Sequence, residues 1–369
     1  MVETLNKLSQ IGQSIWLDNL SRDLITSGEL VRLIEAGVSG ITSNPTIFKN
    51  AIAGSTSYDK LINEELKINP TLSAEQIAEV LMVDDVRQAC EAFLPLYNST
   101  FKKDGYVSLE VPPKFAYDTQ GTVECAKRLW QKVSKPNLMI KIPATKEGLS
   151  AISQTLALGI NVNVTLIFAP NRYQEVARAF LDGAEKFASA GGDLSQLGSV
   201  ASFFVSRVDS QIEKLATNLE SIGKLAETFR VGISNSLFAY KKYLELFHDE
   251  IRFQRLKAAG LRPQRALWAS TSVKSPKLSP LFYLKALALP ETVNTLPSQT
   301  LSELIAADPN TINRTDPDFA EAESLINTLT NAGIDQVSLF ADLESNGIKI
   351  FAESYDQLVA AIGDKINKQ

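Results

Sequence analysis

Short apolar runs alternate along the chain with longer segments whose apolar residues recur at a helical period. This alternation is typical of βα repeats that build a parallel sheet. The runs predicted as strands are 14–18, 40–44, 106–111, 137–142, 161–168, 199–205, 265–270 and 292–296. Helices are predicted between them, for example over 21–36, 73–98, 119–133, 147–157 and 170–189. Eight βα units predict an α/β fold of the (β/α)8 class, the TIM barrel.

The pattern predicts additional helices beyond those that a barrel needs. Residues 208 to about 260 are helical almost throughout and exceed one crossover, so we interpret them as a barrel helix with an inserted helical pair. The tail from about 316 is predicted to pack further helices on the outside. The polar stretch 307–317 is a loop candidate. The prediction is therefore one barrel domain over residues 1–369.

One predicted strand holds a residue that buried strands rarely contain. In NLMIKIPAT, residues 137 to 145, Lys141 stands between Ile140 and Ile142. Side chains alternate between the two faces of a strand, so Lys141 points away from the isoleucines. A buried cation is costly unless it is paired or gives up its proton. Lys141 therefore either reaches solvent or serves chemistry.

Polar residues share a face in the other strands as well. Parallel strands covered on both faces should be apolar throughout, and a barrel builds its active site at the C-terminal ends of its strands. The same alternation groups Trp16 with Asp18; Thr42 with Asn44; Tyr106, Ser108 and Glu110; Asn161, Asn163 and Thr165; Val200, Ser202 and Phe204; and Trp268 with Ser270.

Single members of this set also have ordinary structural interpretations. Asp18 could cap the helix over 21–36, and Asn44 before Pro45 could belong to a turn. Glu110 could end its strand in solvent. Lys141 is harder to explain in this way, and its expected convergence with the polar strand ends favours a catalytic role.

A buried lysine is suited to carbonyl chemistry. An apolar pocket disfavours the charged form of a lysine, and the neutral amine attacks ketones. The resulting Schiff base accepts electrons when an adjacent C–C bond breaks. Asp18 is the candidate base for the hydroxyl on the departing carbon. Glu110, acting through a water held by Thr165, is the candidate proton relay.

Composition excludes several other classes of protein. The chain is 44% hydrophobic and 21% charged with a net charge of −5, and no run of Lys and Arg supports binding to nucleic acid or an anionic membrane. No apolar run approaches the ~18 residues of a membrane span, and the N-terminus MVETLNKLSQIGQ is polar. We therefore expect a cytoplasmic protein.

The sequence has few residues that could bind a metal or form a Ser/His catalytic pair. Cys90 and Cys125 lack metal-ligand spacing and are expected to be inert thiols. His248 is the only histidine of the chain. Neither a metal nor a cofactor is predicted.

Six segments together resemble the transaldolase family in chain order: GITSNPTIF (40–48), VSLEV (107–111), LMIKIPAT (138–145), INVNVTLIF (160–168), VASFFVSRVD (200–209) and WASTSVK (268–274). The resemblance implies a cofactor-independent (β/α)8 enzyme of class I. Such an enzyme transfers a dihydroxyacetone unit from fructose 6-phosphate or sedoheptulose 7-phosphate to erythrose 4-phosphate or glyceraldehyde 3-phosphate, within the non-oxidative pentose phosphate pathway.

The resemblance also implies roles for individual residues. Lys141 would form the imine, Asp18 would act on the C4 hydroxyl, and Glu110 with Thr165 would hold the catalytic water. The residues implied in substrate binding are Asn44 and Asn163 for the dihydroxyacetone hydroxyls, Thr42 and Ser202 beside them, and Arg207 and Ser270 for the phosphate.

Three features depart from short transaldolases and resemble the longer bacterial-type branch. Short members have an arginine two residues after the position of Ser270, where this chain has Ser272 and then Lys274. Lys274 is therefore a further phosphate candidate. Pro112 follows Val111 where short members have aspartate, and they lack much of the helical excess over 208–260.

Two other functions remain as alternatives at this stage. A fructose 6-phosphate aldolase would use the same lysine but release dihydroxyacetone to water. Its relatives are shorter and often carry tyrosine at the relay position, so Glu110 and the chain length favour transfer. A non-catalytic sugar-phosphate-binding barrel would most simply have lost Lys141 or Asp18. The oligomeric state is left open, with a homodimer as one option.

Overall fold

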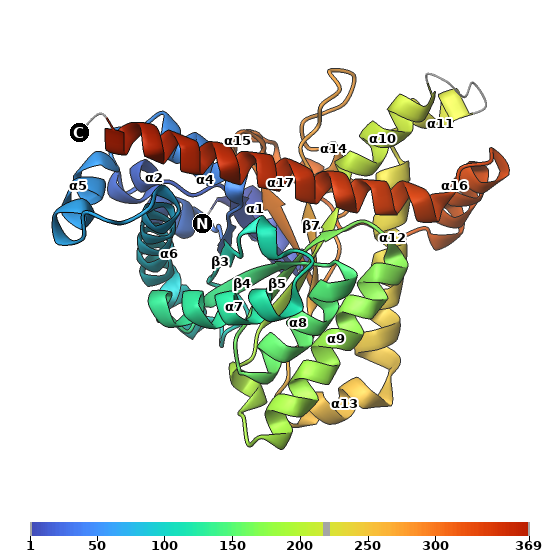
Figure 1. Cartoon of the computed structure of the whole chain (residues 1–369). Helices are drawn as coiled ribbons and strands as arrows, with labels where there is room; N and C mark the ends of the chain where they lie inside the picture. The colour runs from blue at the N-terminus through green and yellow to red at the C-terminus, as the bar shows by residue number, and fades with distance from the viewer. Residues whose placement is uncertain (1, 217–221, 368–369) are drawn as a thin grey trace.

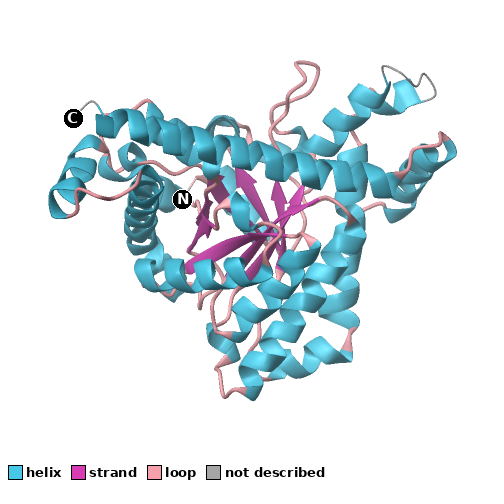
Figure 2. Ribbon diagram, viewed as in Figure 1, coloured by secondary structure: helices cyan, strands magenta, loops and turns pink. Residues whose placement is uncertain are grey.

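The computed structural model describes residues 2–216 and 222–367 and contains the predicted barrel (Figure 1). All strands run parallel and pair in chain order, and β8 closes the barrel against β1. Figure 2 shows the strands at the centre with helices around them. The strands are β1 Gln13–Asp18, β2 Gly40–Thr42, β3 Tyr106–Glu110, β4 Leu138–Pro143, β5 Val162–Ile167, β6 Ser199–Phe204, β7 Arg265–Ala269 and β8 Thr292–Leu296.

Helices follow the strands and form the outer layer. They are α1 Glu3–Ile11, α2 Arg22–Thr26, α3 Glu29–Ala36, α4 Pro45–Ala53, α5 Asp59–Ile68, α6 Ala74–Ser99, α7 Thr119–Val133, α8 Lys146–Ala157, α9 Pro170–Ser189, α10 Ser206–Ala216, α11 Gly223–Ala226, α12 Val231–Leu244, α13 Ile251–Ala258, α14 Phe282–Ala286, α15 Ser298–Ala306, α16 Phe319–Asn331 and α17 Gln336–Asn367.

Local chemistry explains where two elements differ from their predicted bounds. The helix predicted over 21–36 is divided into α2 and α3 by Gly28, whose φ of 77° is left-handed. The strand predicted over 40–44 ends at Thr42, because Asn44 caps α4 by accepting a hydrogen bond from the Ile47 amide. Pro45 then occupies the first helical position, where its missing N–H costs nothing.

Strand alternation separates two apolar layers. Ile140 and Ile142 belong to the layer between the sheet and the helices, whereas Met139 belongs to the interior of the barrel. The prediction for β7 was wrong in this respect. Trp268 faces the helix layer, where its ring packs edge-on against Phe203 with centroids 6.4 Å apart.

Leu267 and Ala269 take the interior positions of β7 instead. The error has a backbone cause. The strand ends at Ala269, and Ser270 has a left-handed φ of 55°, so strand alternation does not extend to it. Ser270 therefore reaches the C-terminal end of the barrel although Trp268 faces outward.

A buried ion pair closes the N-terminal end of the barrel interior. Arg265 contacts Asp104 at 2.9 Å and donates to the Ser14 hydroxyl at 2.6 Å. The Trp16 indole also donates to Asp104, at 3.4 Å. These contacts satisfy the buried charges within the barrel, so this end has a structural explanation.

The C-terminal helix extends over the strand ends. In Figure 1, α17 is the long red helix that runs across the view, and it packs against the outer helices α4 and α6. The sequence analysis predicted helices packed on the outside but no contact with the site. The α17 residues Ile350 and Phe351 line the cavity at the C-terminal ends of the strands. An apolar stripe that includes Leu343, Phe351 and Leu358 accounts for this placement, because it buries one side of the helix.

The predicted insertion over 208–260 is helical wherever it is described. It contains most of α10, then α11, α12, the π-helix η4 Glu245–Asp249 and α13. Residues 217–221 of this prediction lie outside the described residues. Among the described helices, none combines the length and apolar character that crossing a membrane requires.

The packing of Trp16 against Gly40 generates a stability prediction. A Cβ added at Gly40 would lie 2.5 Å from the Trp16 indole, which is fully buried. Gly40→Ala should therefore lower the free energy of unfolding by about 1–3 kcal/mol, measured by urea denaturation. The control is Gly54→Ala, whose nearest neighbour would be 3.9 Å away and whose φ is −97°. Equal stabilities for the two variants would contradict this account.

Candidate active site

A cavity of about 330 Å³ opens at the C-terminal ends of the strands. This is the end at which TIM barrels place their active sites. It brings together residues from most of the strands and from α17. Its lining consists of Asp18, Thr42, Asn44, Thr46, Ile47, Lys141, Thr165, Ser202, Phe204, Arg207, Ala269, Ser270, Ser272, Thr295, Pro297, Ile350 and Phe351.

Lys141 lies inside the barrel and not at its surface. Its residue is 5% exposed, so the side chain does not extend into solvent. The register pairs Lys141 with Glu110 on β3 and with Asn163 on β5. The Lys141 Nζ lies 3.1 Å from the Glu110 Oε2 and donates to the Ser43 carbonyl at 3.1 Å. The strand register thus places an amine against a buried carboxylate.

Two carboxyl groups share this interior with two cations. Burial raises the pKa of Asp18, and the nearby charge of Lys141 opposes that shift. Burial likewise raises the pKa of Glu110, again opposed by Lys141. The pKa of the Arg207 guanidinium is lowered by its own burial. A carboxyl group with a raised pKa can both accept and donate a proton near neutral pH, so Asp18 and Glu110 are suited to proton exchange during a reaction.

Asp18 is held by threonines and not by a helix terminus. Its Oδ1 accepts a hydrogen bond from the Thr42 hydroxyl at 2.7 Å, and the Thr42 and Thr295 hydroxyls lie 2.6 Å apart. The N-cap of α2 is Ser21, whose side chain accepts from the Leu24 amide. The capping interpretation of Asp18 is therefore wrong.

Asn44 combines its structural role with a place at the cavity. Its Oδ1 accepts from the Ile47 amide and so caps α4, as the turn interpretation expected in outline. The same side chain lines the cavity. Capping uses only the carbonyl oxygen, so the two N–H donors of the Asn44 amide are not involved in the cap.

A hydrogen-bonded chain supports the floor beside Lys141. Ser202 donates to the Asn163 Oδ1 at 2.7 Å, and the Asn163 amide donates to the Ser108 hydroxyl at 3.0 Å. Asn163 is fully buried and does not line the cavity, whereas Ser202 does. Asn163 thus orients Ser202 from below.

Thr165 occupies an irregular part of β5. The β5–β6 register shifts between Val164 and Ile167, and Leu166 has a left-handed φ of 59°. Such a conformation is strained for a residue with a side chain. The Thr165 hydroxyl is buried and makes no hydrogen bond to any described residue. It lines the cavity, where it can bind a water or a substrate group.

Arg207 stands at the start of α10 on the other side of the cavity. Its Cζ lies 5.0 Å from the centre of the Phe204 ring and 5.8 Å from that of Phe351. The hydroxyls of Ser206 and Ser270 lie 3.0 Å apart beside it. A guanidinium with neighbouring hydroxyls suits a phosphate group.

Lys274 is not part of this cavity. It is exposed and lines an adjoining cavity of about 380 Å³, together with Lys214 and Ile350. Arg207 and Ile350 line both cavities. The position two residues after Ser270 is Ser272, which does line the main cavity. Lys274 therefore lies in the cavity next to the candidate active site and not in the site itself.

The sequence analysis missed several lining residues, among them Thr295 and Phe351. Thr295 lies two residues after Val293 on β8 and so shares its face of the strand, which points into the barrel. The strand alternation that was applied to the other strands would therefore have identified Thr295. Phe351 lies on α17, far along the chain from the strands, and no strand pattern predicts its position.

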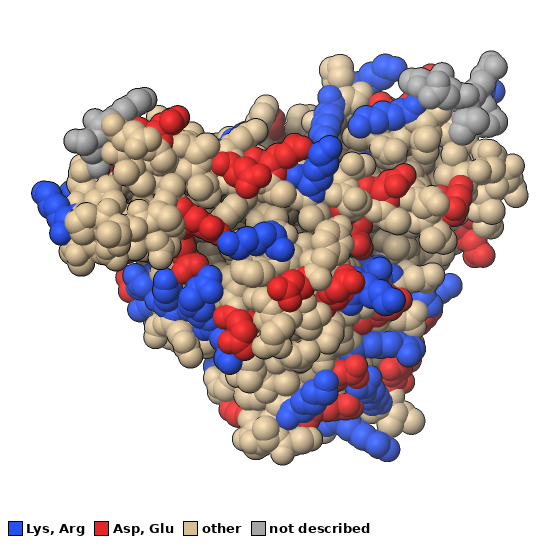
Figure 3. All heavy atoms as spheres, viewed as in Figure 1, with Lys and Arg blue, Asp and Glu red and all other residues tan. Residues whose placement is uncertain are grey.

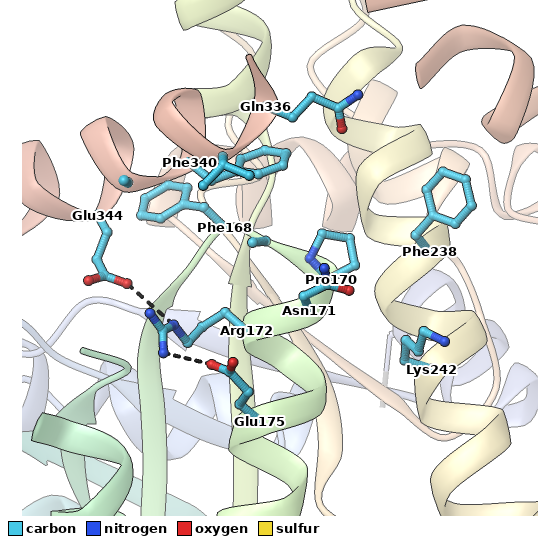
Figure 4. Close-up of a pocket in the computed structure, with 13 residues that line it drawn as sticks. Phe168, Pro170, Asn171, Arg172, Glu175, Phe238, Lys242, Gln336, Phe340 and Glu344 are labelled. Atoms are coloured by element: carbon cyan, nitrogen blue, oxygen red, sulfur yellow. Dashed lines mark hydrogen bonds and ion pairs between the residues drawn. The ribbon is translucent and has the colours of Figure 1, made fainter. Parts of the chain in front are cut away.

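A larger cavity, about 530 Å³, lies between α9, α12 and α17 (Figure 4). Phe168, Phe238 and Phe340 form much of its wall. Its Arg172 is already paired with Glu175 at 2.7 Å and with Glu344 at 3.7 Å. It contains neither the buried Lys141 amine nor the Asp18 carboxyl of the smaller cavity, so volume does not identify the active site here.

Comparison with known proteins places the chain in a family. A transaldolase of Mycobacterium tuberculosis is 43% identical over 359 residues, covering 96% of this chain and 95% of that protein. A transaldolase of Acidothermus cellulolyticus is 44% identical over 372 residues, covering 98% and 96%. A transaldolase 2 of a Nostoc species is 41% identical over 377 residues, covering 99% and 98%. The family model for transaldolase/fructose-6-phosphate aldolase matches residues 15–362, and the chain belongs to this family.

Proposed function

We propose that this chain acts as a transaldolase and that Lys141 carries the transferred unit as a Schiff base. The observation that carries the proposal is the buried Lys141 Nζ, 3.1 Å from Glu110, in a cavity that also contains Asp18. The names of relatives that match nearly the whole chain support the transferase activity. The substrates are sugar phosphates, and no cofactor is required by the chemistry.

The first step joins the ketose phosphate to the enzyme. Lys141 passes a proton to Glu110, and the neutral amine attacks the C2 carbonyl carbon of the substrate. The carbinolamine then loses its hydroxyl as water, with a proton supplied by Glu110. Thr165, whose hydroxyl has no hydrogen-bond partner among the described residues, is the proposed holder of that water.

The second step breaks the C3–C4 bond. Asp18 takes the proton from the C4 hydroxyl, the C4–O bond becomes a carbonyl, and the aldose phosphate departs. The electron pair of the broken bond moves toward the iminium nitrogen, which leaves a three-carbon enamine on Lys141. The raised pKa of Asp18 suits a group that must accept this proton and later return it.

The third step reverses the second on a different aldehyde. The enamine carbon attacks the carbonyl carbon of the acceptor, and Asp18 returns its proton to the new alkoxide. Water then adds to the imine carbon, the C–N bond breaks, and Lys141 regains its free amine. The carbonyl formed on the donor C4 is matched by the carbonyl consumed on the acceptor, so no external oxidant or reductant is needed.

Binding roles follow from the positions around the cavity. Arg207, with Ser270 beside it, is proposed to hold the phosphate. Asn44 and Ser202 are proposed to bind the hydroxyls of the dihydroxyacetone unit, with Thr42 holding Asp18. Asn163 is proposed to act through Ser202, because it lies beneath it.

The aldolase alternative uses the same lysine and the same first two steps. The curated relatives named here are transaldolases, which favours transfer over release to water. The retained Lys141 and Asp18 also speak against a barrel that only binds sugar phosphates. Turnover that depends on an added aldose phosphate distinguishes transfer from both alternatives.

We further propose a cytoplasmic location and no nucleic-acid partner. The net charge of −5 supports this. On the face seen in Figure 3, Lys and Arg are interspersed with Asp and Glu. Such mixed charge does not provide the basic surface that binds a phosphate backbone.

The imine predicts a covalent trap. With fructose 6-phosphate and borohydride, Lys141 should gain the reduced three-carbon unit as a stable secondary amine, located by mass spectrometry on the LMIKIPAT peptide. Lys141→Arg should not be labelled, because arginine stays protonated. Lys274→Ala, which removes an exposed lysine, should be labelled as fully as the unmodified protein. Labelling at another lysine, or turnover without labelling, would show the mechanism to be wrong.

A second prediction concerns Asp18. Asp18→Ala should slow C–C cleavage by roughly 10²–10⁴-fold, the usual contribution of general acid–base catalysis, because no group then takes the C4 proton. The borohydride trap should still label Lys141 with intact substrate. Asp23→Ala removes an exposed carboxylate nearby and should leave the rate within about twofold. A near-normal rate for Asp18→Ala would exclude Asp18 as the base.

A third prediction concerns the phosphate. Arg207→Ala should raise KM for fructose 6-phosphate by about 10–100-fold, the loss expected for hydrogen bonds to a charged group, and change KM for dihydroxyacetone much less. Lys274→Ala should change neither by more than about twofold, since Lys274 lies in the adjoining cavity. Equal increases in KM for fructose 6-phosphate and for dihydroxyacetone in Arg207→Ala would show that the phosphate binds elsewhere.

A further inference from the structure

Phe351 joins two residues of the proposed mechanism from a distant part of the chain. The centre of its ring lies 5.7 Å from the Lys141 Nζ and 5.8 Å from the Arg207 Cζ. The residue is 4% exposed and lines the same cavity as both cations. The Phe351 ring on α17 therefore lies over both the Lys141 amine and the Arg207 guanidinium, the group proposed to bind phosphate. It can make a cation–π contact with each.

The helix that carries Phe351 is closely seated at this point. One turn earlier, a Cβ added at Gly347 would lie 2.9 Å from the Leu166 Cδ2 and 3.4 Å from the Arg207 Nη1. Three residues later, the Ser354 hydroxyl lies 2.8 Å from that of Thr46, another cavity residue. Contacts on both sides thus fix the position of the Phe351 ring over the barrel.

The chemistry gives this cover a consequence. After cleavage, the three-carbon enamine on Lys141 either attacks an aldehyde or is protonated on carbon. Protonation on carbon is followed by addition of water to the imine carbon and breaking of the C–N bond, which releases dihydroxyacetone and restores the amine. Both courses end with hydrolysis of an imine, so each consumes one water. They differ in the step before it, because release requires a proton to be delivered to the enamine carbon, whereas transfer requires an aldehyde there. Exclusion of bulk water from that carbon removes a source of protons and therefore favours transfer.

We propose that Phe351 determines the partition of the enzyme-bound three-carbon unit between transfer to an aldose phosphate and loss to water. This inference rests on the proposed function and adds a specificity-determining residue outside the barrel strands. Phe351 acts by filling the space above Lys141, and not by exchanging a proton, because its side chain has no group that can do so.

The test is a ratio of two rates in the same sample. Dihydroxyacetone release and sedoheptulose 7-phosphate formation are measured together, with fructose 6-phosphate and a fixed concentration of erythrose 4-phosphate. The ratio does not depend on how much of a variant is folded, because both rates come from the same active molecules. A purely structural role for Phe351 would lower both rates and leave the ratio unchanged.

Phe351→Ala should raise the ratio of release to transfer by about tenfold, the result of a relative barrier change of about 1.4 kcal/mol. Phe351→Leu keeps part of the apolar volume and should raise it by about threefold, a relative change of about 0.65 kcal/mol. The matched control is Phe340→Ala, on the same helix but in the wall of the larger cavity of Figure 4, and its ratio should equal that of the unmodified protein.

The proposal is overturned if the ratio stays within about twofold of the unmodified protein in the Phe351 variants. Phe351→Leu keeps this outcome accessible should Phe351→Ala fail to fold. An equal rise in Phe340→Ala would also overturn it, since the effect would then belong to α17 as a whole. Borohydride labelling of Lys141 is run on each protein. Absence of the label in the unmodified protein would reject the proposed function, whereas labelling with a constant ratio rejects only the role of Phe351.

Discussion

The contact between Lys141 and Glu110 is the constraint on which the site depends. Both groups are buried, and an unpaired charge in that position would be strongly unfavourable. Their 3.1 Å approach follows from strand register, since Glu110 on β3 is the neighbour of Lys141 on β4. A shift of one residue between these strands would turn one of the two outward and leave the other unpaired. The reactive pair and the correct pairing of the barrel therefore require each other.

Charge balance explains why the remaining ionisable residues lie where they do. Asp18 and Arg207 line the same cavity as Lys141, and the charges of Lys141 and Arg207 act on both the Asp18 and the Glu110 carboxyl. The pKa values of the Asp18 and Glu110 carboxyls are nevertheless raised, and that of the Arg207 guanidinium is lowered, because burial outweighs the neighbouring charges. A site held in this way is costly in stability but ready for proton exchange, a combination common at catalytic centres. The structural ion pair of Arg265 and Asp104 occupies the opposite end.

Strand periodicity was sufficient to predict the barrel and the centre of its site. All of the predicted strands are present, because buried parallel strands are short apolar runs that sequence makes visible. Lys141, Asp18 and Glu110 were identifiable since each breaks that apolar pattern on an inward position. Periodicity failed for Trp268, where a left-handed residue ends the strand. Lys274 was proposed from the family resemblance and not from periodicity, and it lines the adjoining cavity. Periodicity has no means of placing Phe351, because docking of α17 is decided by tertiary packing.

The position of α17 resolves a conflict inherent in an open barrel. The strand ends must admit sugar phosphates, yet the amine beneath them works best away from bulk water. A loop could cover the site only by moving, whereas α17 is a helix that packs along α4 and is tied to it through Ser354 and Thr46. Gly347 lets the helix approach Arg207 closely, and Phe351 then reaches Lys141 from one turn further on. Phe351 and Ile350 of α17 line the cavity together with the strand residues, so the helix is part of the wall that substrate and water meet.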